Sequence, residues 1–466
     1  MRPTTRLAFA FAVVCGLLLA PAARAAVQQV WISQVDPGPT TPPSDDTGER
    51  IAIDGVGNVL IAGRAGRVPE TARVLVAKLS ANGALQWQRP IDATAPAIFD
   101  GPLFLGLDGT GNVLLAWQES IHSGGVEIDA PIRLAKIGGD GSDIWRTTYN
   151  PSDFVTLGDF AVTADGGLVI VGTSAGTTGN DGLALTVKIG SSGAVQWEDR
   201  FSTAHELAAA TAVAIDPSSG AVVVGGSSAP SGSESKTLFI QYDATGHRQW
   251  SKRIASDRIL NFEEVFDIAV TPSGNILASG RRTAFGGPFH SQGLLYELRG
   301  TNGKLDWSRF SAPSTNDVEF DLVRTDSTGN AIVAGSSNDS PNSTSDRLVA
   351  RFLADGTPVW SQILDLRPVD VISGLALDAA GNAFTTGYST DFNLADPTVW
   401  VTSRFDAATG HAWDVTLDVA TYYDWDKGLD VALTPAGEIV VTGRTLNTVS
   451  PSTFSGDATT IKYAEQ

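Results

Sequence analysis

Acidic and aromatic side chains gather at the starts of several similar apolar segments, and this combination could bind a cation or a polar ligand. The aspartates that open or precede these segments are Asp159, Asp267, Asp321 and Asp430. The aromatic residues near them are Phe266, Phe320, Tyr423 and Trp425. Carboxylate oxygens are preferred Ca²⁺ ligands, and aromatic rings supply contact area for a ligand. We expect these eight residues to form a ligand-binding site, with Ca²⁺ as a candidate ion held by Asp267, Asp321 and Asp430. The alternative is that each carboxylate is a solvated loop residue of an acidic protein.

Motifs for catalysis are scarce in this chain. The five histidines do not pair at metal-ligand spacing, and the sequence contains no HExxH, GxSxG or P-loop motif. The single cysteine, Cys15, lies in an apolar run near the N-terminus, so the rest of the chain has no thiolate nucleophile. We therefore assign no catalytic residue from the sequence.

Two ladders of residues divide the chain into eight copies of one unit. A turn glycine ahead of an apolar segment recurs at intervals of 52 to 56 residues: Gly57, Gly111, Gly166, Gly220, Gly274, Gly329, Gly381 and Gly437. A tryptophan recurs at intervals of 52 to 58 residues: Trp31, Trp87, Trp145, Trp197, Trp250, Trp307, Trp360 and Trp413. Two independent ladders with one period indicate a repeat architecture.

Each copy is predicted to form four short strands. In the fourth copy these are Thr211 to Asp216, Ala221 to Gly225, Thr237 to Tyr242 and His247 to Ile254. The segments are rich in β-branched and aromatic residues and are separated by turn residues. Four strands per copy describe a blade, so we predict an all-β, eight-bladed β-propeller formed by residues 26–466 as a single domain. A linear β-solenoid is the alternative, but its rungs are much shorter.

The ends of the chain predict how the ring closes. The last copy stops without its tryptophan strand, whereas residues 28–33, around Trp31, form such a strand with nothing before it. We expect this N-terminal strand to complete the last blade, which would remove two open sheet edges. In such a ring the first strand of every blade lines a central channel, and the acidic connections described above meet at one mouth of it.

Other repeated positions are expected to be structural. The ladder tryptophans should pack between neighbouring blades and donate their N–H groups to nearby carbonyls. A basic residue ahead of the tryptophan in six copies should face solvent or pair with a carboxylate: Lys78, Lys136, Lys188, Arg351, Arg404 and Lys462. A glycine six residues after the turn glycine recurs in seven copies, and the second copy carries Trp117 instead. This exception makes Trp117 a candidate ligand-binding aromatic, with an ordinary change of packing as the alternative.

The N-terminus has the pattern of a secretory signal peptide. Arg2 and Arg6 precede an apolar run, and Ala23-Arg24-Ala25 provides a small-x-small cleavage site. We predict a signal peptide over residues 1–25 and export to the periplasm, the cell surface or the medium. No later segment is long and apolar enough to span a bilayer, so we expect no membrane insertion of the remainder.

Charge narrows the classes of partner. The 466 residues carry a net charge of −19, which disfavours nucleic acid and anionic membrane surfaces as partners. Acidity favours solubility and attracts cations or basic partners. An unknown protein or carbohydrate ligand is the expected partner, and we expect a monomer.

Three segments resemble the SBBP-type bacterial β-propeller repeats: Asp457 to Tyr463 (DATTIKY), Asp326 to Ser337 (DSTGNAIVAGSS) and Gly374 to Thr390 (GLALDAAGNAFTTGYST). Those repeats are named for a seven-bladed propeller, whereas the count here is eight. The resemblance implies the propeller fold and a secreted bacterial protein without assigned activity.

Two further segments look like the tryptophan-docking motif of eight-bladed quinoprotein dehydrogenases: Phe405 to Trp413 (FDAATGHAW) and Tyr242 to Trp250 (YDATGHRQW). That family pairs the motif with a bound quinone, a calcium ion and often a vicinal disulfide. One cysteine cannot form the disulfide.

Taken together, these patterns favour an exported propeller that acts as a non-catalytic binding or scaffold module, with a cation or ligand at an acidic channel mouth. The alternatives are a propeller hydrolase or lyase that uses the channel-mouth carboxylates, and a quinoprotein-like enzyme.

Overall fold

The computed structural model describes residues 27–465, and every regular element in the described part of the chain is a β-strand. The gaps in the described range are residues 37–45, 67–72, 93–96, 124–125, 152, 176–181, 203–205, 231–233, 255–260, 285–289, 312–315, 340–341, 392–397, 418–425 and 451–452. The predicted signal peptide lies outside the described residues. Within them, no helix has the length and apolarity needed to cross a membrane.

The strands form four-stranded antiparallel units, which we number as blades 1 to 8 along the chain. Blade 1 contains β2 (Thr47–Ile53), β3 (Val59–Ala65), β4 (Arg73–Leu79) and β5 (Leu85–Ile91). Blade 2 contains β6 (Ala97–Leu107), β7 (Val113–Ser123), β9 (Ile132–Ile137) and β10 (Asp143–Tyr149), with the short β8 (Val126–Asp129) paired to β7. Blade 3 contains β11 (Val155–Val162), β12 (Leu168–Ser174), β13 (Leu183–Ile189) and β14 (Val195–Phe201). Blade 4 contains β15 (Glu206–Ile215), β16 (Val222–Pro230), β17 (Lys236–Tyr242) and β18 (Arg248–Ile254).

The second half of the chain repeats this pattern. Blade 5 contains β19 (Asn261–Val270), β20 (Ile276–Ala284), β21 (Ser291–Leu298) and β22 (Leu305–Phe310). Blade 6 contains β23 (Asp317–Thr325), β24 (Ala331–Asp339), β25 (Thr344–Phe352) and β26 (Pro358–Leu364). Blade 7 contains β27 (Val369–Leu377), β28 (Ala383–Thr390), β29 (Val399–Asp406) and β30 (Gly410–Leu417). Blade 8 contains β31 (Lys427–Leu433), β32 (Ile439–Ser450), β33 (Thr453–Glu465) and β1 (Val27–Val35).

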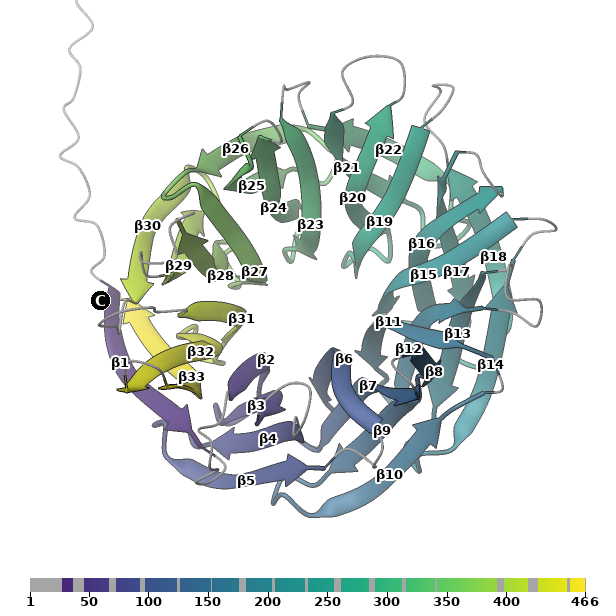
Figure 1. The fold of residues 1–466 in the computed structure, drawn as a ribbon. Helices are drawn as coiled ribbons and strands as arrows, with labels where there is room; N and C mark the ends of the chain where they lie inside the picture. The colour runs from purple at the N-terminus through teal and green to yellow at the C-terminus, as the bar shows by residue number, and fades with distance from the viewer. Residues whose placement is uncertain are drawn as a thin grey trace, which may run out of the picture.

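The blades stand around a ring, with the first strand of each nearest the centre (Figure 1). The N-terminal strand β1 pairs antiparallel with β33, from Val27 opposite Glu465 to Val35 opposite Ala458. Blades 6 and 7 are joined into one sheet by a single parallel bridge between Ser345 and Val369. The prediction of an all-β, multi-bladed propeller is confirmed.

The core consists of apolar layers between neighbouring blades. One layer joins Leu60 and Val76 of blade 1 to Val113 and Leu115 of blade 2, and the other layers pair the blades in the same way around the ring. A further layer packs residues of blade 8 against those of blade 1. The two middle strands of each blade are therefore buried on both faces, which explains their continuous apolar runs.

Six of the eight ladder tryptophans make the predicted hydrogen bond to a carbonyl of the next blade. Trp413 donates to the Glu465 carboxylate instead, and the Trp197 indole N–H has no partner in the described part of the chain. Trp87 of blade 1 donates its indole N–H to the Gly139 carbonyl of blade 2 at 3.1 Å. Trp250 of blade 4 donates in the same way to the Gly300 carbonyl of blade 5 at 2.9 Å. The same bond is made by Trp31, Trp145, Trp307 and Trp360. Each of these contacts falls on the hairpin turn between the third and fourth strands of the next blade.

Turn aspartates and the repeated basic residues also serve the fold. The Asp108 carboxylate accepts the backbone N–H of Asn112 at 3.0 Å and pairs with the Lys136 ammonium group at 2.8 Å. Its pKa is lowered because the bonds from Lys136 and the turn residues outweigh the effect of burial. Lys78 pairs with Asp54 at 3.1 Å in the same arrangement. The expected carboxylate pairing is confirmed, and these turn carboxylates have their donors within the hairpin.

Gly246 provides a test of the tryptophan contact. It has φ +91°, and a Cβ placed there would lie 2.6 Å from the Trp197 ring, whereas Gly437 (φ +81°) has open space around it. Both Gly246→Ala and Gly437→Ala carry the penalty of a positive φ. We expect Gly246→Ala to lower the free energy of unfolding by a further 1–3 kcal/mol or so, because a methyl group must displace the indole. Urea denaturation measures the difference, and equal losses in the two variants would contradict this contact.

Candidate functional site

Three of the predicted site aspartates occupy one equivalent position beside the centre of the ring. Asp159, Asp267 and Asp430 each follow a β-bulge in the innermost strand of blades 3, 5 and 8. Each carboxylate accepts a backbone N–H from the innermost strand of the next blade. The donors are Val213 for Asp159 at 2.8 Å, Val323 for Asp267 at 2.9 Å and Ile51 for Asp430 at 3.1 Å. These aspartates therefore link neighbouring blades, a role that the sequence analysis did not assign to them.

An arginine that the sequence analysis missed lies among these acids. Arg324 on β23 donates to Asp267 at 2.6 Å, and the charge of Asp267, with smaller contributions from Asp430 and Asp159, raises its pKa. Burial, with a further contribution from the charge of Asp267, raises the pKa of Asp159 to about 7. A signal for Arg324 was present, because the equivalent position holds Ala or Gly in the other seven blades: Ala52, Gly106, Ala161, Ala214, Ala269, Ala376 and Ala432.

The fourth aspartate, Asp321, is offset by one residue from the other three. In blade 6 it is the bulged residue itself, and Leu322 occupies the position that corresponds to Asp267. Its carboxylate has no hydrogen-bond partner in the described part of the chain. Burial, then the charge of Glu319, raises the pKa of Asp321 to about 6, and Arg281 offsets part of this rise. Asp321 is thus an unpaired acid beside the centre of the ring.

The charged groups next to Asp321 join blades 5 and 6. Arg281 lies between Glu264, at 2.8 Å, and Glu319, at 2.6 Å, and its guanidinium group lies 5.6 Å from the centre of the Phe266 ring. Phe266 therefore lies beside this charged group. Phe320 does not, because it is 2% exposed and packs against Phe352 in the layer between blades 5 and 6. The expectation of a rim aromatic is wrong for Phe320. Tyr423 and Trp425 lie outside the described residues.

The expected Ca²⁺ ligands do not form a compact set. In the described ranges, one group of acidic or histidine side chains has at least three ligand atoms within 4.8 Å of one another. That group contains none of Asp267, Asp321 and Asp430. Two of the three expected ligands use their oxygens to hold neighbouring blades, as described above.

Trp117 lines a pocket between blades 1 and 2. Trp117 is 4% exposed and packs with Leu103 in the apolar layer. Most of its side chain therefore serves packing, which was the alternative to a ligand-binding role. Strand β6 shifts its register between Phe99 and Leu103, opposite this tryptophan. A pocket of about 240 Å³ opens beside it, lined by Ile91, Asp92, Trp117, Glu119, Arg133, Leu134, Arg146, Thr147 and Thr148.

A buried ion pair forms one wall of this pocket. Glu119 is 1% exposed, accepts the Trp117 indole N–H at 3.1 Å and pairs with Arg133 at 2.9 Å. Arg133 also donates to the Thr148 hydroxyl at 2.6 Å. The sequence analysis missed Glu119 and Arg133, although Glu119 stands two residues after the tryptophan that breaks the glycine pattern.

Comparison with solved structures finds β-propeller proteins. The quinohemoprotein alcohol dehydrogenase of Comamonas testosteroni superposes with a TM-score of 0.57 at 10% identity, over 94% of this chain and 76% of that chain. The polysaccharide lyase Uly1 gives a TM-score of 0.49 at 11% identity, over 90% of each chain. A protein of unknown function from Dyadobacter fermentans gives 0.42 at 12% identity, over 94% of this chain and 99% of that one. No family model and no curated protein matches the chain. At these identities the likeness shows the fold alone.

The tryptophans of the quinoprotein-like motif are committed to packing. Trp250 binds the Gly300 carbonyl of the next blade, and Trp413 is 7% exposed and donates to Glu465 at 2.9 Å. The sequence also lacks the second cysteine of a vicinal disulfide. These contacts assign the two tryptophans to packing between blades, and we derive no quinone chemistry from the motif.

The unpaired acid Asp321 predicts a pH dependence of stability. Because its pKa is higher in the folded chain than its ordinary value of 3.8, its contribution to stability is present below about pH 4 and is lost as the pH rises through about 6. Asp321→Asn should remove this loss. The free energy of unfolding of the variant should exceed that of the unaltered protein by on the order of 1 kcal/mol at pH 8 and should differ little from it at pH 4. Urea denaturation across this range measures it. Asp355→Asn, at a turn carboxylate of lowered pKa, should show no such gain, and the same gain there would contradict the assignment.

Proposed function

We propose that the protein is an exported, SBBP-type bacterial propeller that acts as a non-catalytic binding module, formed by residues 26–466 and monomeric. Its proposed ligand site is the pocket between blades 1 and 2. The observation that carries the proposal is the coincidence of this pocket with Trp117, the one break in the glycine ladder. A repeat that departs from its own pattern and gains a pocket at that place is a candidate for function.

The buried ion pair in the pocket supports a binding role. Such a pair adds little to stability compared with apolar residues of the same volume, because the Glu119 carboxylate is buried and loses its hydration. Arg133, opposite Trp117, takes the position that a leucine occupies opposite the ladder glycine in five other blades: Leu75, Leu185, Leu238, Leu294 and Leu348. We infer that the pair is kept to orient a ligand.

The chemistry of the lining indicates the class of ligand. Arg133 and Arg146 supply guanidinium donors, Thr147 and Thr148 supply hydroxyl groups, and Leu134 supplies an apolar wall. A volume of about 240 Å³ accommodates one sugar ring rather than a chain. Arginine forks pair with carboxylates, and hydroxyl groups bind hydroxyl groups. A single acidic sugar, such as a uronate, matches this set, which agrees with the expected carbohydrate ligand.

Titration calorimetry with glucuronate tests the site. Arg146 is 41% exposed and Arg248, on the outer strand of blade 4, is 44% exposed, so the two form a matched pair. We expect glucuronate to bind the unaltered protein, Arg146→Ala to weaken binding at least about tenfold because a charged hydrogen bond is lost, and Arg248→Ala to leave it unchanged. No heat with glucuronate, or equal affinities in the two variants, would overturn the pocket assignment. Glucose as a second probe separates recognition of the carboxylate from recognition of the hydroxyl groups.

A second candidate function is a hydrolase or lyase that uses acids beside the centre of the ring. It rests on Asp159 and Asp321, whose pKa values are raised to about 7 and about 6, the range that suits a general acid or base. If Asp321 were the base, activity on a uronate-containing polysaccharide would rise with pH through about 6 and disappear in Asp321→Asn. Uronate release or the absorbance of the unsaturated product measures this, and retained activity in Asp321→Asn would remove the candidate.

A further inference from the structure

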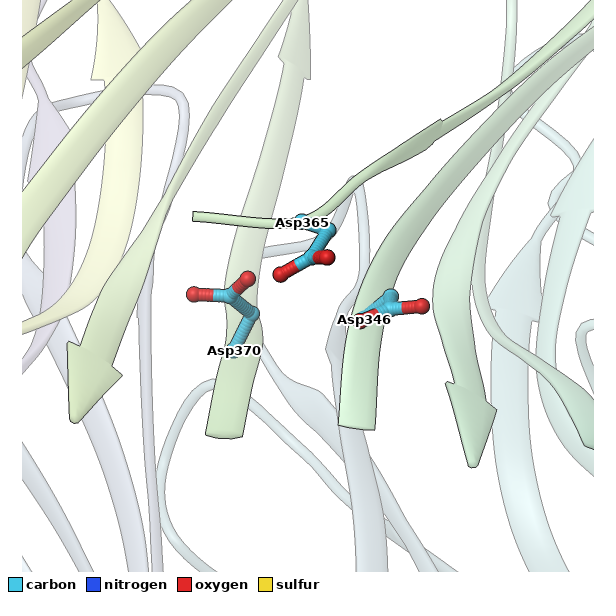
Figure 2. A group of neighbouring side chains, drawn as sticks. All are labelled: Asp346, Asp365 and Asp370. Atoms are coloured by element: carbon cyan, nitrogen blue, oxygen red, sulfur yellow. The ribbon is translucent and has the colours of Figure 1, made fainter. Parts of the chain in front are cut away.

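Three aspartates converge where blades 6 and 7 are joined into one sheet. The parallel bridge between Ser345 and Val369 brings the next residues of the two strands, Asp346 and Asp370, side by side. The bridge is supported by the Ser345 N–H, which donates to the Pro368 carbonyl at 2.9 Å. Asp365 follows strand β26 and approaches from the connection to β27 (Figure 2). One oxygen of each carboxylate lies within 4.8 Å of an oxygen of the other two.

Asp370 carries a buried carboxylate oxygen without a donor. The residue is 0% exposed, and its Oδ2 accepts the backbone N–H groups of Leu366 at 2.7 Å and Arg367 at 3.3 Å. Its Oδ1 is buried and has no hydrogen-bond partner. Figure 2 shows one oxygen of this carboxylate turned toward Asp365. An unsatisfied buried acceptor costs about 1–3 kcal/mol, and more when it is charged, so this atom calls for a partner.

Equivalent acids in other blades have donors. Asp46, Glu263 and Asp426 occupy the same position at the start of the innermost strands of blades 1, 5 and 8, and all are 0% exposed. Asp46 accepts the Gly66 N–H at 2.9 Å, and Asp426 accepts the Leu446 N–H at 3.1 Å. Glu263 accepts the Tyr296 hydroxyl at 3.1 Å. The unpaired oxygen of Asp370 is therefore not a general property of the repeat.

Blades 4 and 5 provide an internal comparison. A parallel bridge between Ser235 and Phe262 corresponds to the one between Ser345 and Val369. The residues that follow it are Lys236 and Glu263, a cation beside a buried acid. At the corresponding positions between blades 6 and 7, the chain has Asp346 and Asp370, and Asp365 adds a third acid.

We propose that Asp346, Asp365 and Asp370 form a Ca²⁺ site that clamps blade 6 to blade 7. Calcium takes carboxylate oxygens at 2.3–2.6 Å, so two of its ligands stand up to about 5 Å apart, and one oxygen of each of the three aspartates lies within 4.8 Å of the others. Magnesium keeps several of its waters and is usually held by one or two carboxylates, so a set of three carboxylates favours calcium. In the described part of the chain, none of the three carboxylates forms an ion pair.

The charges in the site agree with this assignment. Three carboxylates with oxygens within 4.8 Å of one another repel one another when ionised, and a bound cation would relieve this repulsion. The site is open on one side, because Asp365 is exposed while Asp346 is half-buried and Asp370 is buried. Waters and backbone carbonyls would complete a coordination number of six to eight.

Calorimetric titration of the metal-stripped protein with Ca²⁺ tests the proposal, together with melting curves. We expect a dissociation constant on the order of 10⁻⁵ to 10⁻³ M, a rise in Tm with Ca²⁺ and at least about tenfold weaker binding of Mg²⁺. Asp365→Asn, at the exposed ligand, should weaken Ca²⁺ binding at least tenfold. Asp321→Asn, the control at the unpaired acid of blade 6, should leave it unchanged.

A charge substitution tests the geometry independently. Asp346→Lys places a cation beside Asp370, as Lys236 follows the corresponding bridge of blades 4 and 5, so the Ca²⁺-free variant should melt at or above the temperature of the Ca²⁺-free unaltered protein and should not respond to Ca²⁺. No heat and no change of Tm with the unaltered protein would overturn the proposal. So would Ca²⁺ binding that survives both Asp365→Asn and Asp346→Lys, or that is lost only in Asp321→Asn.

Discussion

Packing between neighbouring blades is the interaction on which the rest of the structure depends. The middle strands of each blade are apolar on both faces, so a single blade would expose apolar surface to water on both sides, which is unfavourable. Burial is complete only where each blade has a neighbour on both sides, and the layer between blades 8 and 1 supplies the last of these contacts. The pairing of β1 with β33 serves the same end, because it gives the last sheet its outer strand from the opposite end of the chain.

This constraint assigns most of the repeated polar residues to the fold. Asp267 and Asp430 hold the amide groups of the next blade, and Lys136 holds a turn carboxylate of its own blade. A residue type that recurs at one position in several blades is thus explained by a contact that also recurs. The residues left for function are those that occur once, such as Trp117 and Arg324. For that reason the proposed ligand pocket lies at a break in the repeat. The proposed ion site adds Asp346 and Asp365 to Asp370, whose buried acidic position recurs in blades 1, 5 and 8.

The sequence predicted the parts of the structure that recur with its period. The two ladders located the strands, the turns and the contact of each indole with the next blade, since each rests on local residues repeated eight times. Register was harder to predict. Asp321 looked equivalent to Asp267, but Phe266 and Asp321 are the bulged residues of blades 5 and 6. Asp321 therefore lies one residue before the position of Asp267, and a shift of one residue turns a side chain to the other face. The approach of Asp365 to Asp346 depends on a bridge between two blades, and no periodic signal marks it.

Repetition also provides a way to separate a structural acid from a ligand. Asp370 and Glu263 occupy one backbone position beside the same kind of parallel bridge, so burial and strand geometry are closely matched between them. Their surroundings differ in charge, because Lys236 stands beside Glu263 where Asp346 stands beside Asp370. A buried acid is tolerated when a donor or a cation compensates it. In blade 5 the chain supplies a tyrosine hydroxyl donor. In blade 7 it places two further acids around an oxygen without a donor, and a bound cation is the partner that satisfies all three carboxylates at once.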